Sequence, residues 1–473
     1  MKREGLNMSS PLTAEQKTIH FLDRTSFGVT PEIVQRVNRI GMSVYLDAQL
    51  QPEKISDDLV EEKVSALKTI RLNSGELFDL YPPPKVAKER GMAADMMKAP
   101  RMIIYELQQA RLLRAVQSQR QLNELMVDFW NNHFNIFAAK GADRWLTTSY
   151  DRDTIRPHAL GKFRDLLLAT AKSPAMLFYL DNWLSVSPTA ARMPANARRR
   201  GLNENYGREL MELHTLGVDG GYTQQDVREV ARCFTGWTLL RPRGDAEFRF
   251  EPRLHDPGEK IVLGRRITLG GMDDGVQVID LLARHPSTAK FIATKLARRF
   301  VADDPPASIV NRAADTFRRS DGDIRTVLRT IIDSPEFFSP EFYRAKVKKP
   351  LEFAASALRI TGADVRVTPQ LIRYLGRMGE PLFLAQPPTG YPDLGSSWIS
   401  PDMLLTRMNF AADLVGNRLD GARVEPAALR DTQGLIRLVA PDSLSPATRR
   451  ALAETDEKEG PAMLLAAPEF QRR

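Results

Sequence analysis

The chain has 473 residues, of which 42% are hydrophobic and 27% charged, and lysine plus arginine exceed aspartate plus glutamate by eight. This composition is typical of a globular protein with a large core, and the basic excess is too dispersed to be a nucleic-acid signature. The single cysteine excludes an internal disulfide and a zinc site built from cysteine pairs, so any metal must be bound by His, Asp or Glu.

Apolar residues recur at three- and four-residue steps through most of the chain, which predicts a mainly α protein, a multi-helix globular array. The pattern breaks between about residues 246 and 270, where short alternating runs predict one small β-hairpin insertion. We expect one large helical domain over residues 1–420 and peripheral C-terminal helices over residues 421–473. The predicted helices span residues 12–20, 31–50, 56–70, 99–129, 162–171, 226–234, 276–283, 287–301, 307–318, 324–332, 350–360, 368–378 and 403–415.

The segment from Asn203 to Trp237 holds the densest group of polar side chains, with six carboxylates, three arginines and one histidine. Charges at this density destabilise a protein when they are buried without compensation, so we look for a functional site here first. A helix over residues 203–216 turns about 100° per residue, which places Glu209 and Glu212 on one stripe and His214 on another. We predict that Glu209, Glu212 and His214 are catalytic, with His214 taking its partners from elsewhere in the chain.

The same segment also has a structural interpretation. Glu204, Arg208 and Glu212 are four residues apart and would form a ladder of ion pairs along a solvated helix face. Thr223, with Asp226 three residues later, is typical of the N-cap of a following helix. The histidine spacings of zincins and di-iron bundles are absent, and so are phosphate-loop, esterase and dinucleotide motifs. We therefore expect no nucleotide cofactor.

Four of the six histidines lie in clusters of polar or aromatic residues: His133, His158, His214, and His255 beside Asp256. Histidine is the commonest metal ligand and the readiest acid or base near neutral pH. We predict that the four segments converge on one site, where His133, His158, His255 and Asp256 bind a divalent metal such as zinc, iron or manganese. The alternative is that each histidine satisfies a local hydrogen bond.

Two features of the sequence predict where the protein is located. Residues 1–8 lack the apolar core of a secretory signal, and no window reaches the roughly 20 apolar residues that span a bilayer. We therefore expect a soluble, cytoplasmic protein without a membrane span.

The polar clusters resemble motifs of a bacterial family known as domain of unknown function 1800. The resemblance rests on HFLDRTSFG at 20–28, FWNNHF at 129–134, IRPHALG at 155–161, LNENY at 202–206, RELMELHTLG at 208–217, TGW at 235–237, HD at 255–256, HP at 285–286 and PTGY at 388–391. These motifs follow one another in order, so the resemblance covers most of the chain. Gly207 stands where relatives usually carry alanine.

The resemblance implies no established activity. It implies that relatives are often exported, whereas the start of this sequence predicts a cytoplasmic protein. It also implies that relatives often accompany proteins of the domain of unknown function 1501 family, which look like sulfatase or phosphatase relatives. We name that family as the expected partner. Two functions fit the sequence. The first is a metal-dependent or acid–base hydrolytic enzyme, and the second is a non-catalytic helical scaffold or accessory protein that binds a partner and whose polar clusters form a buried network.

Overall fold

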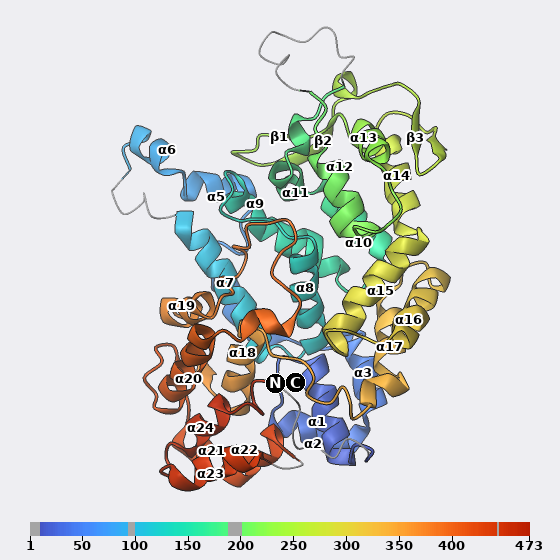
Figure 1. Ribbon diagram of the computed structural model, residues 1–473. Helices are drawn as coiled ribbons and strands as arrows, with labels where there is room; N and C mark the ends of the chain where they lie inside the picture. The colour runs from blue at the N-terminus through green and yellow to red at the C-terminus, as the bar shows by residue number, and fades with distance from the viewer. Residues whose placement is uncertain (1–9, 93–99, 188–200, 442–443) are drawn as a thin grey trace.

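The computed structural model describes residues 10–92, 100–187, 201–441 and 444–473. Helices make up most of the described chain, as predicted (Figure 1). Residues 1–8, on which the predicted location depends, lie outside the described ranges. Within those ranges, no helix is both long and apolar enough to cross a membrane.

Local sequence signals set the first helices. α1 (Ala14–Thr25) begins at Thr13, which forms a capping box with the first turn. α2 (Pro31–Ile40) and α3 (Met42–Gln49) divide the single helix predicted over residues 31–50. Gly41 separates them because its φ of 86° lies in the left-handed region that ends a helix.

The helix predicted over residues 99–129 is also divided, into α7 (Pro100–Gln117) and α8 (Gln121–His133). The Gln121 side-chain amide donates to the backbone carbonyls of Ala115 and Ser118. These bonds satisfy carbonyl groups that the end of α7 leaves without helical partners. A buried amide therefore fixes the break between the two helices.

Two helices widen into π-helical turns. α9 (Asp143–Ser149) continues into Tyr150–Ile155, and α12 (Asn205–Glu209) continues into Leu210–Thr215. In the second turn the backbone N–H of residue 216 donates to the carbonyl five residues earlier, at 2.8 Å. The helix predicted over 203–216 therefore begins later and is wider near His214 than the α-helical geometry assumed above. Such turns often occur at functional sites.

Three two-stranded antiparallel sheets interrupt the helices in the described part of the chain. β1 (Trp237–Leu240) pairs with β2 (Glu247–Phe250), and β3 (Lys260–Val262) pairs with β4 (Arg265–Ile267). The predicted insertion is therefore present as two hairpins. The third pair, β5 (Asp364–Val365) with β6 (Ala422–Arg423), joins the start of the C-terminal region to the preceding helices.

The remaining helices are α4 (Asp58–Ser65), α5 (Ser74–Leu80), α6 (Pro84–Glu89), α10 (Phe163–Lys172), α11 (Pro174–Tyr179), α13 (Gln224–Cys233), α14 (Asp273–Ala283), α15 (Pro286–Phe300), α16 (Ala307–Arg319), α17 (Ile324–Ile332), α18 (Pro350–Ile360), α19 (Pro369–Arg377), α20 (Pro401–Val415), α21 (Pro426–Leu429), α22 (Thr432–Val439), α23 (Pro446–Glu454) and α24 (Gly460–Ala466).

The apolar interior contains two large clusters. One includes residues of α8 and α15, and the other includes residues of α7, α18 and α20. The region after residue 421 contributes Leu464 and Phe470 to the second cluster. The irregular segment 380–393 runs beside α7 and in front of α8 in Figure 1. Its Leu382 belongs to the second cluster and its Tyr391 is bonded to Asn132 of α8, so the segment lies where the two clusters meet. This junction is where charged side chains gather.

Candidate functional site

The structure brings two of the predicted residues, His133 and His214, together in the interior. Their ring centroids are 6.2 Å apart, and His133 Nε2 donates to the backbone oxygen of His214 at 3.1 Å. Burial lowers the pKa of both histidines, that of His214 to about 3. Both rings are therefore neutral at neutral pH. His133 Nδ1 is buried and has no hydrogen-bond partner in the described chain.

His158 and His255 make other hydrogen bonds. His158 Nδ1 donates at 2.8 Å to the backbone carbonyl four residues earlier. His255 Nδ1 donates to a backbone carbonyl at 2.8 Å, and its Nε2 lies 3.2 Å from the Asp274 carboxylate. Asp256 accepts two bonds from Arg232, at 2.9 and 3.1 Å. Among the described residues, no group of three or more His, Cys, Asp or Glu side chains is arranged to hold a metal ion.

Glu209 and Glu212 lie half-buried at the start of the second π-helical turn, whereas His214 is buried. Burial and the neighbouring Glu212 raise the pKa of Glu209. The Tyr222 hydroxyl donates to Glu212 at 3.4 Å. Of the predicted ladder of ion pairs, the first pair is present: Arg208 Nη2 lies 3.5 Å from Glu204 Oε2. The two predicted catalytic carboxylates are thus neighbours at the edge of the interior.

Side chains of α8, of the residues that directly follow it and of α11 hold the segment 380–393. The Asn132 amide donates to Tyr391 O at 3.0 Å and accepts from Tyr391 N–H at 2.7 Å. Asn135 donates to two carbonyls of the same segment, and the Tyr179 hydroxyl donates to a third. Gly390 has a φ of 70°, and a Cβ there would lie 2.4 Å from Asn132 O. Only glycine permits this approach.

An arginine of α7 links two carboxylates beneath this segment. Arg111 donates to Asp128 of α8 at 3.2 Å and to Asp151 of the first π-helical turn at 2.5 Å. The Asn131 amide also donates to Asp151, at 2.8 Å. The Asp128 side chain keeps one fifth of its area exposed, while that of Arg111 is almost fully buried. Asp128 is therefore a paired carboxylate that solvent can still reach.

A second carboxylate, Asp393, is shared by two lysines. Lys349 Nζ lies 3.2 Å and Lys295 Nζ lies 3.6 Å from its oxygens. Burial acts to raise the pKa of Asp393, but the two lysines outweigh it and hold this pKa far below its ordinary value. The charge of Lys349 is thus already matched by an ionised partner.

Glu380 is buried in the same junction without such a partner. Only 4% of its surface is exposed, and it accepts the Leu351 N–H at 2.8 Å. Within the described ranges it forms no ion pair at 4 Å or less. Burial and the nearby Asp128 raise the pKa of Glu380 to about 8, against an opposing effect of Lys349. The raised pKa favours the protonated form of the Glu380 carboxyl near neutral pH.

These groups line a small cavity of about 40 Å³, which we call the Glu380 cleft. The space holds a few water molecules or one small substituent of a ligand. A buried carboxyl group, a second carboxyl group paired with an arginine, two cations and several amides converge on it, which is the combination expected at a catalytic pocket. Its polar lining consists of Arg111, Asp128, Asn131, Asn132, Asn135, Lys349, Glu380 and Tyr391.

Asp128, Lys349 and Glu380 were not among the residues predicted from the sequence. Two of the sequence motifs lie beside them, because Asn131 and Asn132 belong to FWNNHF and Tyr391 belongs to PTGY. The two motifs supply the amide of Asn132 and the glycine at 390, which hold the segment 380–393 against α8. Glu380 lies in an irregular segment with no recognisable spacing, so only its burial identifies it.

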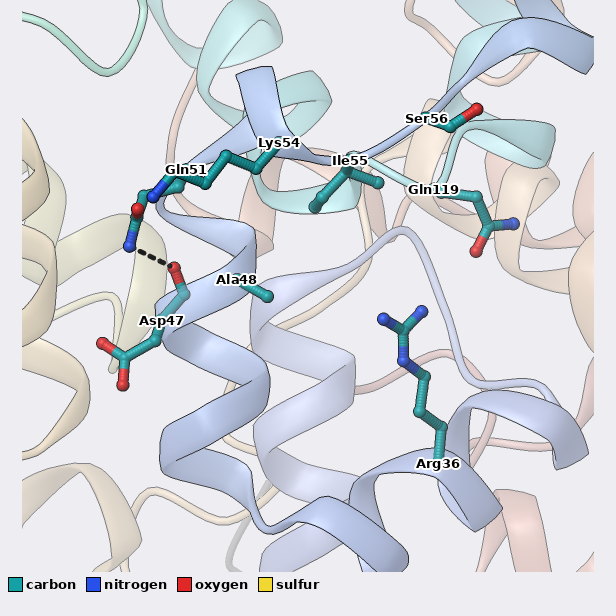
Figure 2. Close-up of a pocket in the computed structure, with 8 residues that line it drawn as sticks. All are labelled: Arg36, Asp47, Ala48, Gln51, Lys54, Ile55, Ser56 and Gln119. Atoms are coloured by element: carbon teal, nitrogen blue, oxygen red, sulfur yellow. Dashed lines mark hydrogen bonds between the residues drawn. The ribbon is translucent and has the colours of Figure 1, made fainter.

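A larger hollow of about 500 Å³ lies among the N-terminal helices (Figure 2). Arg36, Asp47, Gln51 and Lys54 contribute its polar groups, and Gln51 Nε2 donates to the Asp47 carbonyl at 3.3 Å. Arg36, Asp47 and Lys54 are exposed. Exposed charges of this kind are screened by water and salt, whereas the charges of the Glu380 cleft are largely buried.

Fold and site together define a mainly α-helical protein with a buried cluster of ionisable groups at the junction of its two apolar clusters. The model of a family described as protein of unknown function (DUF1800) matches residues 20–472. The match covers nearly the whole chain, and the protein belongs to this family. No curated protein and no solved structure matches the chain.

Proposed function

We propose that the protein is an acid–base enzyme that hydrolyses a polar substrate, of which only the small group that reacts enters the Glu380 cleft. The observation that carries the proposal is a buried Glu380 without an ion pair in the described chain, whose pKa is raised by burial, near an Asp128 that is paired and partly exposed. A general acid and a general base are often two carboxyl groups in unlike environments, and here one is buried without an ion pair whereas the other is partly exposed and paired with Arg111. We assign the acid to Glu380 and the base to Asp128.

In the proposed reaction, Asp128 takes a proton from a water molecule as that water attacks the substrate. Glu380 gives its proton to the leaving group, and the bond to the leaving group breaks. Proton exchange with solvent then restores both carboxyl groups. The Asn132 amide nitrogen donates one hydrogen bond, to Tyr391 O, and its second N–H can orient a polar group of the substrate. Activity should fall as the pH rises through about 8, because Glu380 then loses the proton it must donate.

The experiment is a hydrolysis screen of the purified chain with ester, amide, glycoside and phosphoester substrates. We expect Glu380→Gln and Asp128→Asn each to lower the rate by about 100-fold or more, the effect of removing a general acid or base. Glu454→Gln, an exposed change on α23, is the matched control. A rate that neither cleft variant changes would contradict the assignment.

The predicted metal requires its own test. His133 Nδ1 offers a free lone pair, since the other nitrogen donates to His214 O. The residues around it do not supply a ligand set of three within the described chain, so the described residues do not fit a metal and we derive no step through one. Elemental analysis after incubation with zinc, iron and manganese tests the prediction. One metal ion retained per chain by the wild type, and lost in His133→Phe, would support it.

The predicted roles of Glu209, Glu212 and His214 are tested in the same screen. If Glu209→Gln lowers the rate while Glu380→Gln does not, the catalytic site lies at the second π-helical turn. If the wild-type protein hydrolyses nothing and both variants fold normally, the scaffold function is favoured. The predicted partner of the domain of unknown function 1501 family then becomes the first protein to test for binding.

A further inference from the structure

A second polar hollow, of about 670 Å³, lies next to the Glu380 cleft. The ion pair of Arg111 with Asp151 separates the two spaces, since Arg111 lines the cleft and Asp151 lines the hollow. α4, α7 and the first π-helical turn contribute to its wall. The proposed hydrolysis uses none of the residues discussed below, and the inference does not rest on it.

Arg156 lines this hollow with unused hydrogen-bond donors. Its Nη1 donates to Glu124 at 2.5 Å, and its Nη2 lies 3.7 Å from Asp151 Oδ2. Nε and Nη2 are both buried and have no hydrogen-bond acceptor in the described chain. The π-helical turn explains this position, because it brings residues five apart, Asp151 and Arg156, onto one face.

Thr148 supplies a third buried polar atom without a partner. The residue is 1% exposed, it lines the hollow, and its hydroxyl has no hydrogen-bond partner in the described chain. A buried hydroxyl or guanidinium nitrogen that stays unpaired costs about 1 to 3 kcal/mol. The three atoms belong to two residues that line one hollow, and an acceptor that enters this hollow from solvent would satisfy them.

The other charges around the hollow limit the kind of acceptor. Arg114 is matched by Glu61 through bonds of 3.1 and 2.9 Å. Arg120 is half-buried, and its Nε donates to a backbone carbonyl at 2.8 Å, which leaves the rest of its guanidinium for a ligand. Asp58 and Glu62 of α4 are exposed and line the same hollow. Arg71 and Arg152 also line the hollow, so its positive and negative side chains are nearly balanced, which favours a ligand with a single oxyanion over a highly charged anion.

We propose that this hollow is a binding site for a small molecule with one carboxylate or phosphate group, which Arg156 and Thr148 hold by hydrogen bonds. The planar guanidinium matches the two oxygens of such a group, and the threonine hydroxyl donates to one of them. Arg120 adds positive charge beside the bound group.

Isothermal titration calorimetry of the full chain tests the proposal, with sodium phosphate and sodium acetate titrated separately and ionic strength held constant with sodium chloride. We expect at least one of the two anions to bind saturably, with one site per chain. The anion that binds more tightly identifies the preferred oxyanion. Thr148→Val and Arg156→Lys should each weaken it about tenfold, the effect of losing a hydrogen bond to a charged group. Arg430→Lys, an exposed change after α21, should leave binding unchanged.

Thr148→Val keeps the experiment decisive if Arg156→Lys does not fold, because removal of an unpaired buried hydroxyl does not destabilise the protein. Absence of saturable binding of both anions would overturn the proposal. Equal binding to the wild type and to Thr148→Val would mean an adventitious ion only, and would overturn it as well.

Discussion

Glu380→Gln should make the free energy of unfolding less dependent on pH. In the folded protein the pKa of Glu380 is raised from 4.5 to about 8, so the unfolded chain releases this proton first as the pH increases. Stability from this group is complete below pH 4.5 and is lost as the pH rises toward 8. One pH unit between the two pKa values corresponds to about 1.36 kcal/mol, which gives an upper bound of roughly 5 kcal/mol.

Glutamine keeps the side-chain oxygen that accepts the Leu351 N–H but carries no charge. We therefore expect the variant to resemble the wild type near pH 5 and to be more stable, by about 2 kcal/mol or more, near pH 8.5. Urea denaturation followed by circular dichroism at pH 5, 7 and 8.5 measures this difference. Exposed Glu454→Gln serves as the control and should show no such trend. A Glu380→Gln variant that is less stable than the wild type at pH 8.5 would refute the reasoning.

Two further changes test the contacts around the cleft. Gly390→Ala should lower the melting temperature more than Gly264→Ala, because both glycines have φ near 70° but only the first faces a clash, at 2.4 Å from Asn132 O. The expected costs are about 3 and 1 kcal/mol, and equal losses would show that the segment can move away from α8. Asp393→Asn should destabilise the protein at pH 7 and have a smaller effect at pH 3, because the lysines that lower the pKa of Asp393 stabilise only its ionised form. Urea midpoints at the two pH values test this, and a loss that is equal at both would rule out an ionic role.

Helix positions were predictable because amphipathic periodicity is a local property of the sequence. The mainly α class and the hairpin region followed from it, whereas the breaks at Gly41 and at residues 118–120 did not. Gly41 ends a helix through its backbone conformation, and Gln121 ends α7 through its own side chain. A periodicity of three and four residues continues across both breaks. The π-helical turns were missed for the same reason, since a pattern at 100° per residue assumes α-helical geometry.

The candidate site was only partly predictable because it is assembled from distant segments. FWNNHF and PTGY were recognised as motifs, but their contact through Asn132 and Tyr391 spans 259 residues of sequence. The pKa of Glu380 depends on burial and on Asp128, and neither can be derived from its neighbours in the sequence. The histidines were predicted as site residues because they are rare in the sequence. The structure places His133 and His214 among aromatic rings in the interior, where burial lowers the pKa of both.

The most direct test of the account is a titration of the Glu380 side-chain carboxyl by carbon-13 NMR, with the signal assigned by its absence in Glu380→Gln. The account predicts a midpoint near pH 8 in the folded protein, coincident with the loss of any hydrolytic activity. A midpoint near the ordinary value of 4.5 would show that Glu380 is ionised at neutral pH and cannot act as the acid.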